Sequence, residues 1–405
     1  MEIHVQKSTM IRPAQETPKQ RLRNSVLDLI APSNYVPLVF FYRRPNYSSP
    51  NFFDAGLLKE ALKKILVPFH PVAGRLPSDE SGRTDILCNG EGVLFVEAET
   101  SCVIDDFGDF AEGSKLLPLL PTFDDTKDNS SYPLMMTQVT RFKCGGVCLA
   151  TRFHHILADG ASTYHFVNSW AEMTRGVPIS IPPFFDRTVL DFGQIKILKE
   201  KSKENRGSTF EYTRLEVLAA HIWRCVCKAR ELSDDQASKL HFPTNGRSKL
   251  NPPLPSGYFG NVVFTTALIA LSGNILSEPL NYTVERIHRA LERMNDEYLK
   301  SALAYLRQQP DPTVLRRGAH TYKCPNFNIV YLANMPIYDA NFGWGPPMFS
   351  RLVNTYFEGV AHIYPSPSND GSLTVFINLE THHVQPFKKL FYEIFQHPKN
   401  ARSRY

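Results

Sequence analysis

The sequence predicts a mixed α/β protein (α+β, with mixed sheets) built from two domains. Short apolar runs typical of strands and stretches with helical apolar spacing follow one another without strict alternation. The 405 residues are more than a single core usually organises, and 42% of them are hydrophobic. A lysine-rich polar stretch interrupts the apolar pattern near the middle. We therefore expect a first domain over residues 1–185, a crossover over 186–207 and a second domain over 208–405.

In the first half, apolar runs predict strands, and one helix has a clear start and stop. Asp54 is a typical N-cap residue, and the apolar residues after it recur at helical spacing until Pro68 ends the helix. The segment over 105–128 is acidic and polar and predicts a loop. The expected strands cover residues 2–5, 36–42, 83–87, 92–98, 135–142 and 146–153.

The second half is expected to open with a helix over 213–230. A longer helix is expected over 283–308, where apolar residues keep helical spacing throughout. Pro386 is expected to begin the last helix, which would place His382 and His383 at the end of a strand. The expected strands of this half cover residues 260–270, 327–332 and 373–379.

Composition and charge exclude several functions. The net charge is +5, but no block of Lys and Arg with interleaved aromatic residues indicates a nucleic-acid surface. The seven cysteines show no CxxC spacing, so we expect reduced thiols and no metal site. No apolar run reaches the length of a membrane span, and the N-terminus lacks the apolar core of a signal peptide. We therefore expect a cytoplasmic protein without membrane insertion.

The most informative stretch joins the strand over 146–153 to a helix that begins near Asp159 and Gly160. His155 lies on this connection, and a histidine can take a proton from a hydroxyl or an amine near neutral pH. His154 is expected to point the opposite way, because neighbouring strand residues alternate between faces. The same pattern also suits a histidine that is merely packed and hydrogen-bonded, so this motif alone leaves catalysis open.

A second stretch near the C-terminus places a tryptophan between two glycines. Glycines on both sides of a large ring favour a tight turn that buries it. By itself this pattern favours a structural turn far from any chemistry. The residues concerned are Asn341, Phe342, Gly343, Trp344 and Gly345.

Together these stretches resemble the plant BAHD acyl-CoA-dependent acyltransferases. The family's first motif, His-x-x-x-Asp-Gly, is matched by His155, Asp159 and Gly160, and its second, Asp-Phe-Gly-Trp-Gly, by 341–345 with one change. The resemblance runs nearly end to end and is strongest to the hydroxycinnamoyl-CoA shikimate/quinate transferase branch. Further matching segments are 9–14, 68–76, 106–110, 182–188, 245–248, 257–261 and 317–326.

The resemblance implies a fold, a reaction and roles for individual residues. It implies two similar-sized chloramphenicol-acetyltransferase-like domains around a central solvent channel. His155 would be the general base, with no covalent intermediate, and Asp159 would point away from the substrate into an ion pair. The turn over 341–345 would shape the CoA side of the channel, and Arg247 and Ser248 would contact CoA. Acyl-CoA would be a cosubstrate with no permanently bound cofactor, and the protein would be a monomer in plant specialised (phenylpropanoid) metabolism.

The departures from the family pattern concern three places. The Asp of the second motif, which usually pairs with the arginine matching Arg247, is Asn341 here, so we expect lower stability or looser CoA binding. The crossover is shorter than the branch usually has. Arg317 is retained as the residue expected to hold an acceptor carboxylate, but its usual Thr and Trp neighbours are Val330 and Leu332, and three hydroxyl-bearing side chains of the branch have become apolar over 35–40. The implied acceptor and acyl pocket comprises Tyr35, Val36, Leu38, Phe40, Arg317, Val330 and Leu332.

The expected reaction is transfer of a hydroxycinnamoyl-type acyl group from CoA to shikimate, quinate or another hydroxy acid. Three alternatives remain open at this point. One is a condensation-type enzyme that shares the first motif but takes acyl groups from carrier proteins. Another is a non-catalytic binding protein on the same fold. The third is an acyltransferase whose acceptor is an amine, because a neutral histidine can serve either nucleophile.

Overall fold

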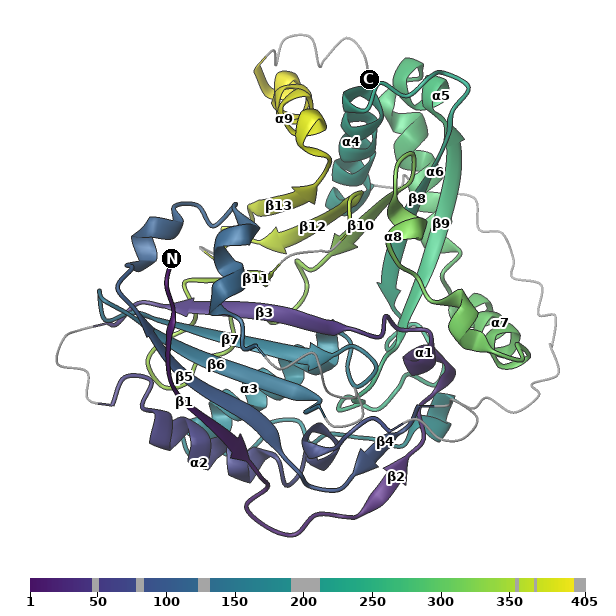
Figure 1. Ribbon diagram of the computed structural model, residues 1–405. Coiled ribbons are helices and arrows are strands. Elements are labelled where there is room, and N and C mark those ends of the chain that lie inside the picture. The colour runs from purple at the N-terminus through teal and green to yellow at the C-terminus, as the bar shows by residue number, and fades with distance from the viewer. Residues whose placement is uncertain are drawn as a thin grey trace.

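The computed structural model describes residues 1–45, 51–77, 84–122, 132–190, 212–353, 357–367 and 370–396. Its described part contains two large mixed sheets, one in each half of the molecule (Figure 1). The predicted mixed α/β class is confirmed. None of the described helices is both long and apolar enough to cross a membrane.

The first sheet has six strands and is antiparallel except for one inner pair. In spatial order its strands are β1 (His4–Ile11), β5 (Val93–Thr100), β6 (Met135–Phe142), β7 (Val147–His154), β3 (Tyr35–Tyr42) and β11 (Phe349–Leu352), with β5 and β6 parallel. A separate two-stranded sheet joins β2 (Gln20–Leu22) to β4 (Ile86–Cys88).

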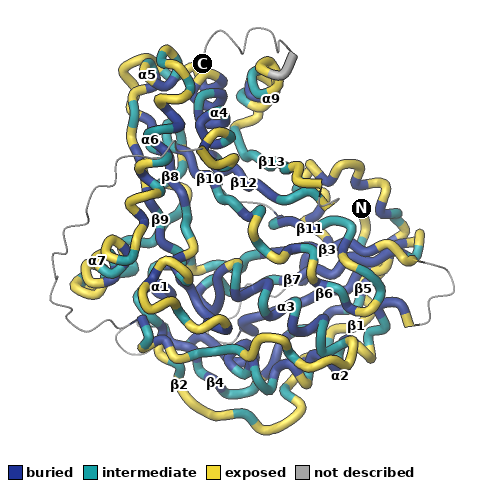
Figure 2. The backbone as a smooth tube through the Cα atoms, turned by 180° about the vertical axis from the view of Figure 1, so that it is seen from behind, coloured by how far each residue is buried: buried dark blue, intermediate teal, exposed yellow. Residues whose placement is uncertain are grey.

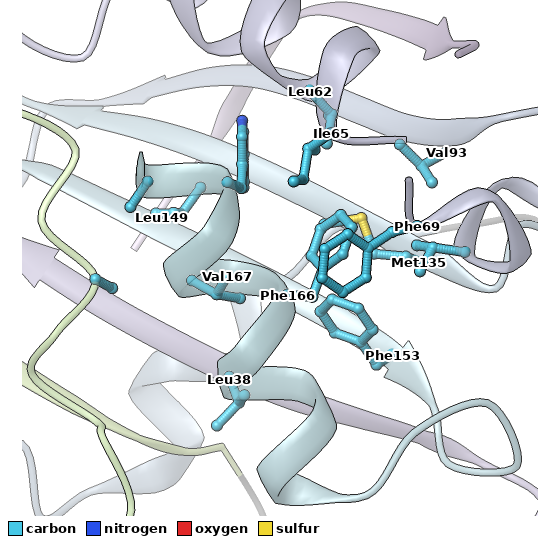
Figure 3. Packing of buried hydrophobic residues seen from close by; sticks show 14 of the residues in the cluster. Leu38, Leu62, Ile65, Phe69, Val93, Met135, Leu149, Phe153, Phe166 and Val167 are labelled. Atoms are coloured by element: carbon cyan, nitrogen blue, oxygen red, sulfur yellow. The ribbon is translucent and has the colours of Figure 1, made fainter. Parts of the chain in front are cut away.

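Helices α2 (Ala55–Ile65) and α3 (Gly160–Thr174) pack on the first sheet. Leu62 and Ile65 of α2 and Phe166 of α3 are fully buried in one cluster with strand residues such as Phe153 (Figure 3). This packing fixes both ends of the β7–α3 connection. The connection is therefore a rigid place for a functional side chain.

The second sheet has five strands in the order β13 (Leu373–Asn378), β12 (Val360–Pro365), β10 (Phe327–Tyr331), β8 (Ala237–Asn245) and β9 (Val263–Leu271). The three central strands are parallel, and both edge strands run antiparallel to their neighbours. Helices α4 (Arg214–Ala229), α5 (Ser272–Ser277), α6 (Leu280–Glu292) and α9 (Thr381–Gln396) pack around a second core that includes Trp223. Figure 2 shows that buried residues concentrate on the inner strands of the two large sheets and on α3 and α4, whereas the edge strands β1 and β13 are mostly exposed or intermediate.

The two halves interlock. Strand β11 belongs to the second half of the sequence but pairs antiparallel with β3 at the edge of the first sheet, with Phe349 opposite Phe41. Of the expected crossover, residues 187–190 form a short 3-10 helix, and residues 191–207 lie outside the described part. The first sheet therefore includes a strand from residues 208–405, which the division by sequence did not foresee.

Many expected elements are confirmed, including the strand β3, the helix α4 and the helix capped by Asp54, whose side chain accepts from the N–H of Leu57 at 2.9 Å. The acidic stretch expected as a loop contains two 3-10 helices over Ile104–Phe107 and Gly113–Leu119, and its residues 123–128 lie outside the described part. Residue 83 of an expected strand also lies outside it, and the strand β4 begins at Ile86.

Two expectations about helices were wrong. The single helix expected over 283–308 is two helices, α6 and α7 (Asp296–Arg307), because Asn295 caps a new helix by accepting from the N–H of Tyr298 at 3.0 Å. The last helix, α9, begins at Thr381 rather than at Pro386. His382 and His383 therefore lie in its first turn, not at a strand end.

Candidate active site

A cavity of about 340 Å³ is lined by both halves of the molecule. The first half contributes α1 (Val26–Leu29), the start of β3 and the β7–α3 connection, and the second contributes β8, β9, β10 and β12. The cavity contains both polar and apolar side chains, as small-molecule sites usually do. It is therefore the candidate active site.

His155 lies on the cavity wall directly after β7. Its backbone N–H donates to the carbonyl of Asn34 at 2.9 Å, and its Nδ1 lies 3.2 Å from Oδ1 of Asn261. Nδ1 is thus bound within the protein, which leaves Nε2 as the nitrogen available to a molecule in the cavity. His155 has the position that a general base needs.

His154 has a different environment, as the alternation of strand faces predicted. Its ring meets that of Tyr35 edge-on, with 5.1 Å between the centroids, and it does not contribute to the cavity lining. Burial, together with the nearby charges of His155 and Arg316, lowers the pKa of His154 to about 4. His154 is therefore a neutral packing residue near pH 7.

Asp159 and Gly160 also line the cavity, but the Asp159 carboxylate is committed to the protein. It caps α3 by accepting from the N–H of Ser162 at 3.0 Å, and it accepts from the N–H of Val262 at 3.0 Å. Arg247 donates to both of its oxygens, at 2.7 and 2.9 Å. Burial would raise the pKa of Asp159, but the charge of Arg247 and these hydrogen bonds outweigh it and lower the pKa below 3.8. The ion pair expected for Asp159 is present.

On the sequence alone, residue 341 was expected to be the position that pairs with Arg247, and this was wrong. Oδ1 of Asn341 accepts from the backbone N–H groups of Gly343 and Gly345 at 2.9 and 3.0 Å. The backbone carbonyl of Asn341 accepts from the guanidinium of Arg175. Both glycines have positive φ, 106° and 101°, which a side chain would disfavour. An amide oxygen makes these hydrogen bonds as a carboxylate would, so the reason for expecting weaker folding disappears.

The rest of the second motif packs into the first core. Phe342 is buried against Trp170 with 5.1 Å between ring centroids, and Trp344 packs against Phe53 at 5.1 Å. None of the five residues over 341–345 lines the cavity. The turn packs as a structural element, as its composition alone favoured, and its expected role in shaping the CoA side of the channel stays a prediction.

The residues expected to contact CoA are placed differently from each other. Arg247 lines the cavity, but its guanidinium also donates to Oγ of Ser162 at 3.0 Å and to the carbonyl of Gly260 at 2.9 Å, besides Asp159. Ser248 is exposed. The hydrogen bonds of Arg247 therefore link the two halves of the protein. The contact of Arg247 and Ser248 with CoA stays a prediction.

The expected acceptor and acyl pocket is found in part. Tyr35, Val36, Arg317, Val330 and Leu332 line the cavity. The prediction was wrong for Leu38 and Phe40, which are buried in the first core and do not contribute to the lining. Figure 3 shows Leu38 in that cluster. The strand β3 reaches the cavity only with its first residues, and beyond Pro37 it runs into the core.

Arg317 brings a half-buried positive charge to the cavity. Its guanidinium donates to Oγ1 of Thr265 at 2.5 Å, and in the part of the chain that the structure describes it forms no ion pair with a carboxylate. Burial lowers the pKa of Arg317, and its charge adds to burial in lowering the pKa of His241 to about 4. This end of the cavity suits an anionic group.

Sequence reasoning missed two residues that hold His155 in place, Asn261 and the fully buried Asp28. The sidechain Nδ2 of Asn261 donates to Oδ1 of Asp28 at 3.0 Å. On the sequence alone, 257–261 is identified only as a segment that matches the family, and no role is assigned to Asn261. Asp28 closes a capping box that begins at Ser25, and this local pattern indicates a helix start but no contact with Asn261.

The described residues include one group that could bring metal ligands together, outside the cavity. Glu380, His382 and His383 have ligand atoms within 4.8 Å of one another at the start of α9. Two of these side chains are exposed. Exposed groups of this kind often occur without an ion, so the expectation of no metal site stays a prediction.

Comparisons with known proteins fit this architecture. The profile of the Transferase family matches residues 1–193 and 189–394. Over 437 aligned positions the chain is 47% identical to shikimate O-hydroxycinnamoyltransferase of Nicotiana tabacum, covering 97% of this chain and 100% of the relative. It is 42% identical to a hydroxycinnamoyl-CoA:5-hydroxyanthranilate N-hydroxycinnamoyltransferase of Avena sativa and 41% identical to rosmarinate synthase of Plectranthus scutellarioides, with the same coverage.

Solved structures show the same fold at low sequence identity. Vinorine synthase superposes with a TM-score of 0.75 at 21% identity, over 95% of this chain and 96% of that one. TRI101 of F. graminearum, in complex with coenzyme A and T-2 mycotoxin, gives 0.75 at 15% identity, over 91% and 97%. With the family profile and the close relatives, these matches show that the chain belongs to the Transferase family, the acyl-CoA-dependent BAHD acyltransferases that its motifs resemble.

Proposed function

We propose that the protein transfers an aromatic, hydroxycinnamoyl-type acyl group from its CoA thioester to the hydroxyl of a carboxylate-bearing acceptor, such as shikimate, quinate or another hydroxy acid. The observation that carries the proposal is the placement of His155 on a cavity lined by both halves, with Nδ1 bound to Asn261. The names of relatives 41–47% identical to this chain support the acyl donor.

The proposed reaction uses Nε2 of His155, the ring nitrogen that does not contact Asn261. The acceptor hydroxyl donates a hydrogen bond to Nε2 and gives up its proton as its oxygen attacks the thioester carbonyl. The tetrahedral oxyanion then collapses, the carbon–sulfur bond breaks, and the CoA thiolate takes the proton from the imidazolium. His155 forms no covalent bond to the acyl group. General base catalysis of this kind contributes on the order of 10²–10⁴-fold to the rate.

Arg317 gives the acceptor its orientation. Among the described residues no carboxylate pairs with this half-buried guanidinium, so it can bind an anion with less competition from water than a fully exposed arginine. The apolar side chains of Val330 and Leu332 line the same cavity and would contact the rest of the acceptor or the acyl chain. The acceptor carboxylate therefore binds at Arg317 while its hydroxyl faces His155.

The protein uses acyl-CoA as a cosubstrate and needs no permanently bound cofactor. Since one chain supplies both walls of the cavity, a monomer is sufficient for activity. We propose a cytoplasmic location for the enzyme. An exposed turn at Ser248, next to Arg247, is the proposed contact for CoA phosphates.

The test is release of the CoA thiol from p-coumaroyl-CoA by the purified protein. Shikimate, quinate, other hydroxy acids and a panel of amines are compared as acceptors. We expect acceptor-dependent release that falls by about 100-fold or more in His155→Ala. The matched control is His382→Ala, which removes an exposed histidine outside the cavity and should leave the rate unchanged.

Two outcomes would contradict the proposal. Unchanged release in His155→Ala would remove His155 as the base. Release that requires an amine, with no hydroxy acid accepted, would replace the proposed O-acyl transfer with N-acyl transfer.

A further inference from the structure

Asn261 contacts His155 through a side chain whose orientation is fixed. It is 2% exposed and lies just before β9. Its Nδ2 donates to three oxygens, namely Oδ1 of Asp28 at 3.0 Å and the backbone carbonyls of His155 and Ile156 at 2.9 and 3.2 Å. Backbone carbonyls can only accept hydrogen bonds, so the amide nitrogen must face them. The amide oxygen is left facing His155.

This orientation determines where the imidazole carries its hydrogen. Oδ1 of Asn261 lies 3.2 Å from Nδ1 of His155, and an amide oxygen cannot donate. The hydrogen of the contact must therefore belong to Nδ1. In a neutral imidazole with hydrogen on Nδ1, the lone pair is on Nε2.

Asp28 in turn holds Asn261. Oδ1 of Asp28 also accepts from the backbone N–H of Asn261 at 2.8 Å, and Oδ2 accepts from the backbone N–H of Ser25 at 2.8 Å. Arg187 lies 3.2 Å from Oδ2, and both side chains of this ion pair are buried. Turning the amide over would place its oxygen against the Asp28 carboxylate and two carbonyls, which repel it.

We propose that Asn261, anchored by Asp28, is a positioning residue that holds His155 in the tautomer whose Nε2 can accept a proton. The inference rests on the proposed function, because the tautomer matters only if His155 is the base. With the hydrogen on Nε2 instead, the ring would present a donor to the acceptor hydroxyl and could not deprotonate it. The tautomer of His155 is therefore determined by a residue 106 positions away, in the other half of the chain.

The first test is the ¹⁵N NMR spectrum of the full-length protein labelled at histidine, recorded where the imidazoles are neutral. The His155 signals are assigned by their loss in His155→Gln. We expect a pyrrole-type Nδ1 and a pyridine-type Nε2 in the wild-type protein, and a mixture of both tautomers in Asn261→Ala. Because the wild-type spectrum needs no variant at Asn261, this test holds even if Asn261→Ala folds poorly.

The second test is steady-state kinetics with p-coumaroyl-CoA and the best acceptor. In Asn261→Ala we expect kcat to fall by about 10- to 100-fold while both KM values stay within about twofold, because the wrong tautomer binds substrates but does not react. Asn168→Ala is the matched control. Its Nδ2 also joins the two halves, by donating to the carbonyl of Pro336 at 3.1 Å, but it does not line the cavity.

A pyridine-type Nδ1 in the wild-type protein would overturn the inference. So would an Asn261→Ala variant that keeps both the wild-type tautomer and the wild-type kcat, or one in which both KM values rise as much as kcat falls. Retained activity in His155→Ala would instead remove the proposed function itself, so the two failures are distinguishable.

Discussion

Asp159 and Arg247 form a bidentate ion pair that joins the two halves of the chain, with distances of 2.7 and 2.9 Å. Asp159 follows His155 by four residues and caps α3, and Arg247 follows β8 in the second half. The Asp159 side chain is 1% exposed and that of Arg247 is 15% exposed. The pair therefore holds the loop of the candidate base against the second sheet, without touching the base itself.

Arg247→Ala should destabilise the fold strongly. It leaves the buried Asp159 carboxylate without its partner, which typically costs about 3–5 kcal/mol in the free energy of unfolding. The measurement is urea denaturation followed by circular dichroism. Glu60→Ala is the control, because its partner Lys63 is an exposed i,i+3 neighbour and the pair should contribute less than about 1 kcal/mol. A loss below 1 kcal/mol in Arg247→Ala would contradict the structural role.

Asn341→Asp should leave the protein close to wild type. A carboxylate can accept from the N–H groups of Gly343 and Gly345 as the amide does, and Arg175 lies beside the turn. We expect the free energy of unfolding to change by less than about 1 kcal/mol, whereas Asn341→Ala should lower it by about 1–3 kcal/mol because the two N–H groups lose their acceptor. Thermal melting compares the variants. Strong stabilisation by Asn341→Asp would restore the importance of the missing charge.

What the sequence predicted correctly was local. The Asp54 cap, the helix α4 and the strand β3 depend on residues a few positions apart, so their patterns were readable without the fold. The helix expected over 283–308 failed because the apolar spacing continues across Asn295, although this residue caps a new helix. A local cap can interrupt a pattern that periodicity alone extends.

The candidate site could be predicted only in part for the same reason. His155 and Asp159 lie in one motif, but their partners Asn261 and Arg247 are 106 and 88 residues away. Such pairings depend on how the two halves meet, which no local pattern encodes. The prediction that Phe40 lines the cavity failed for a related reason. The alternation of strand residues tells which residues share a face. It does not tell how far along the strand that face borders the cavity, because this depends on the neighbouring β-strands.

Acid should destabilise the protein between about pH 6.5 and pH 4 because buried histidines stay neutral in the fold. Burial, with the charges of His155 and Arg316, lowers the pKa of His154 to about 4, and burial with the charge of Arg351 lowers that of His362 to about 3. In the unfolded chain a histidine has a pKa of about 6.5. Between these values the unfolded state binds a proton that the folded state does not, so the free energy of unfolding rises with pH across this window.

The check is urea denaturation from pH 4.5 to pH 7 for the wild-type protein and His154→Gln. Each unit of difference between the folded and unfolded pKa corresponds to 1.36 kcal/mol, so His154 accounts for up to about 3 kcal/mol of the pH dependence. The variant should have a flatter pH profile by this amount. His382→Gln removes an exposed histidine and serves as the control. Identical slopes for wild type and His154→Gln would contradict the predicted neutral state of His154.

Arg317→Gln should weaken binding of the acceptor and spare the donor. The amide can still bond to Thr265 but has no charge for an acceptor carboxylate. We expect the KM of a carboxylate-bearing acceptor to rise by about tenfold or more, and the KM of p-coumaroyl-CoA to stay within about twofold. The same acceptor as its methyl ester is the sharpest comparison, because it should bind equally to the wild type and the variant. An unchanged acceptor KM in Arg317→Gln would show that the carboxylate binds elsewhere. If the KM rose equally for the acid and its ester, Arg317 would shape the cavity without binding the charge.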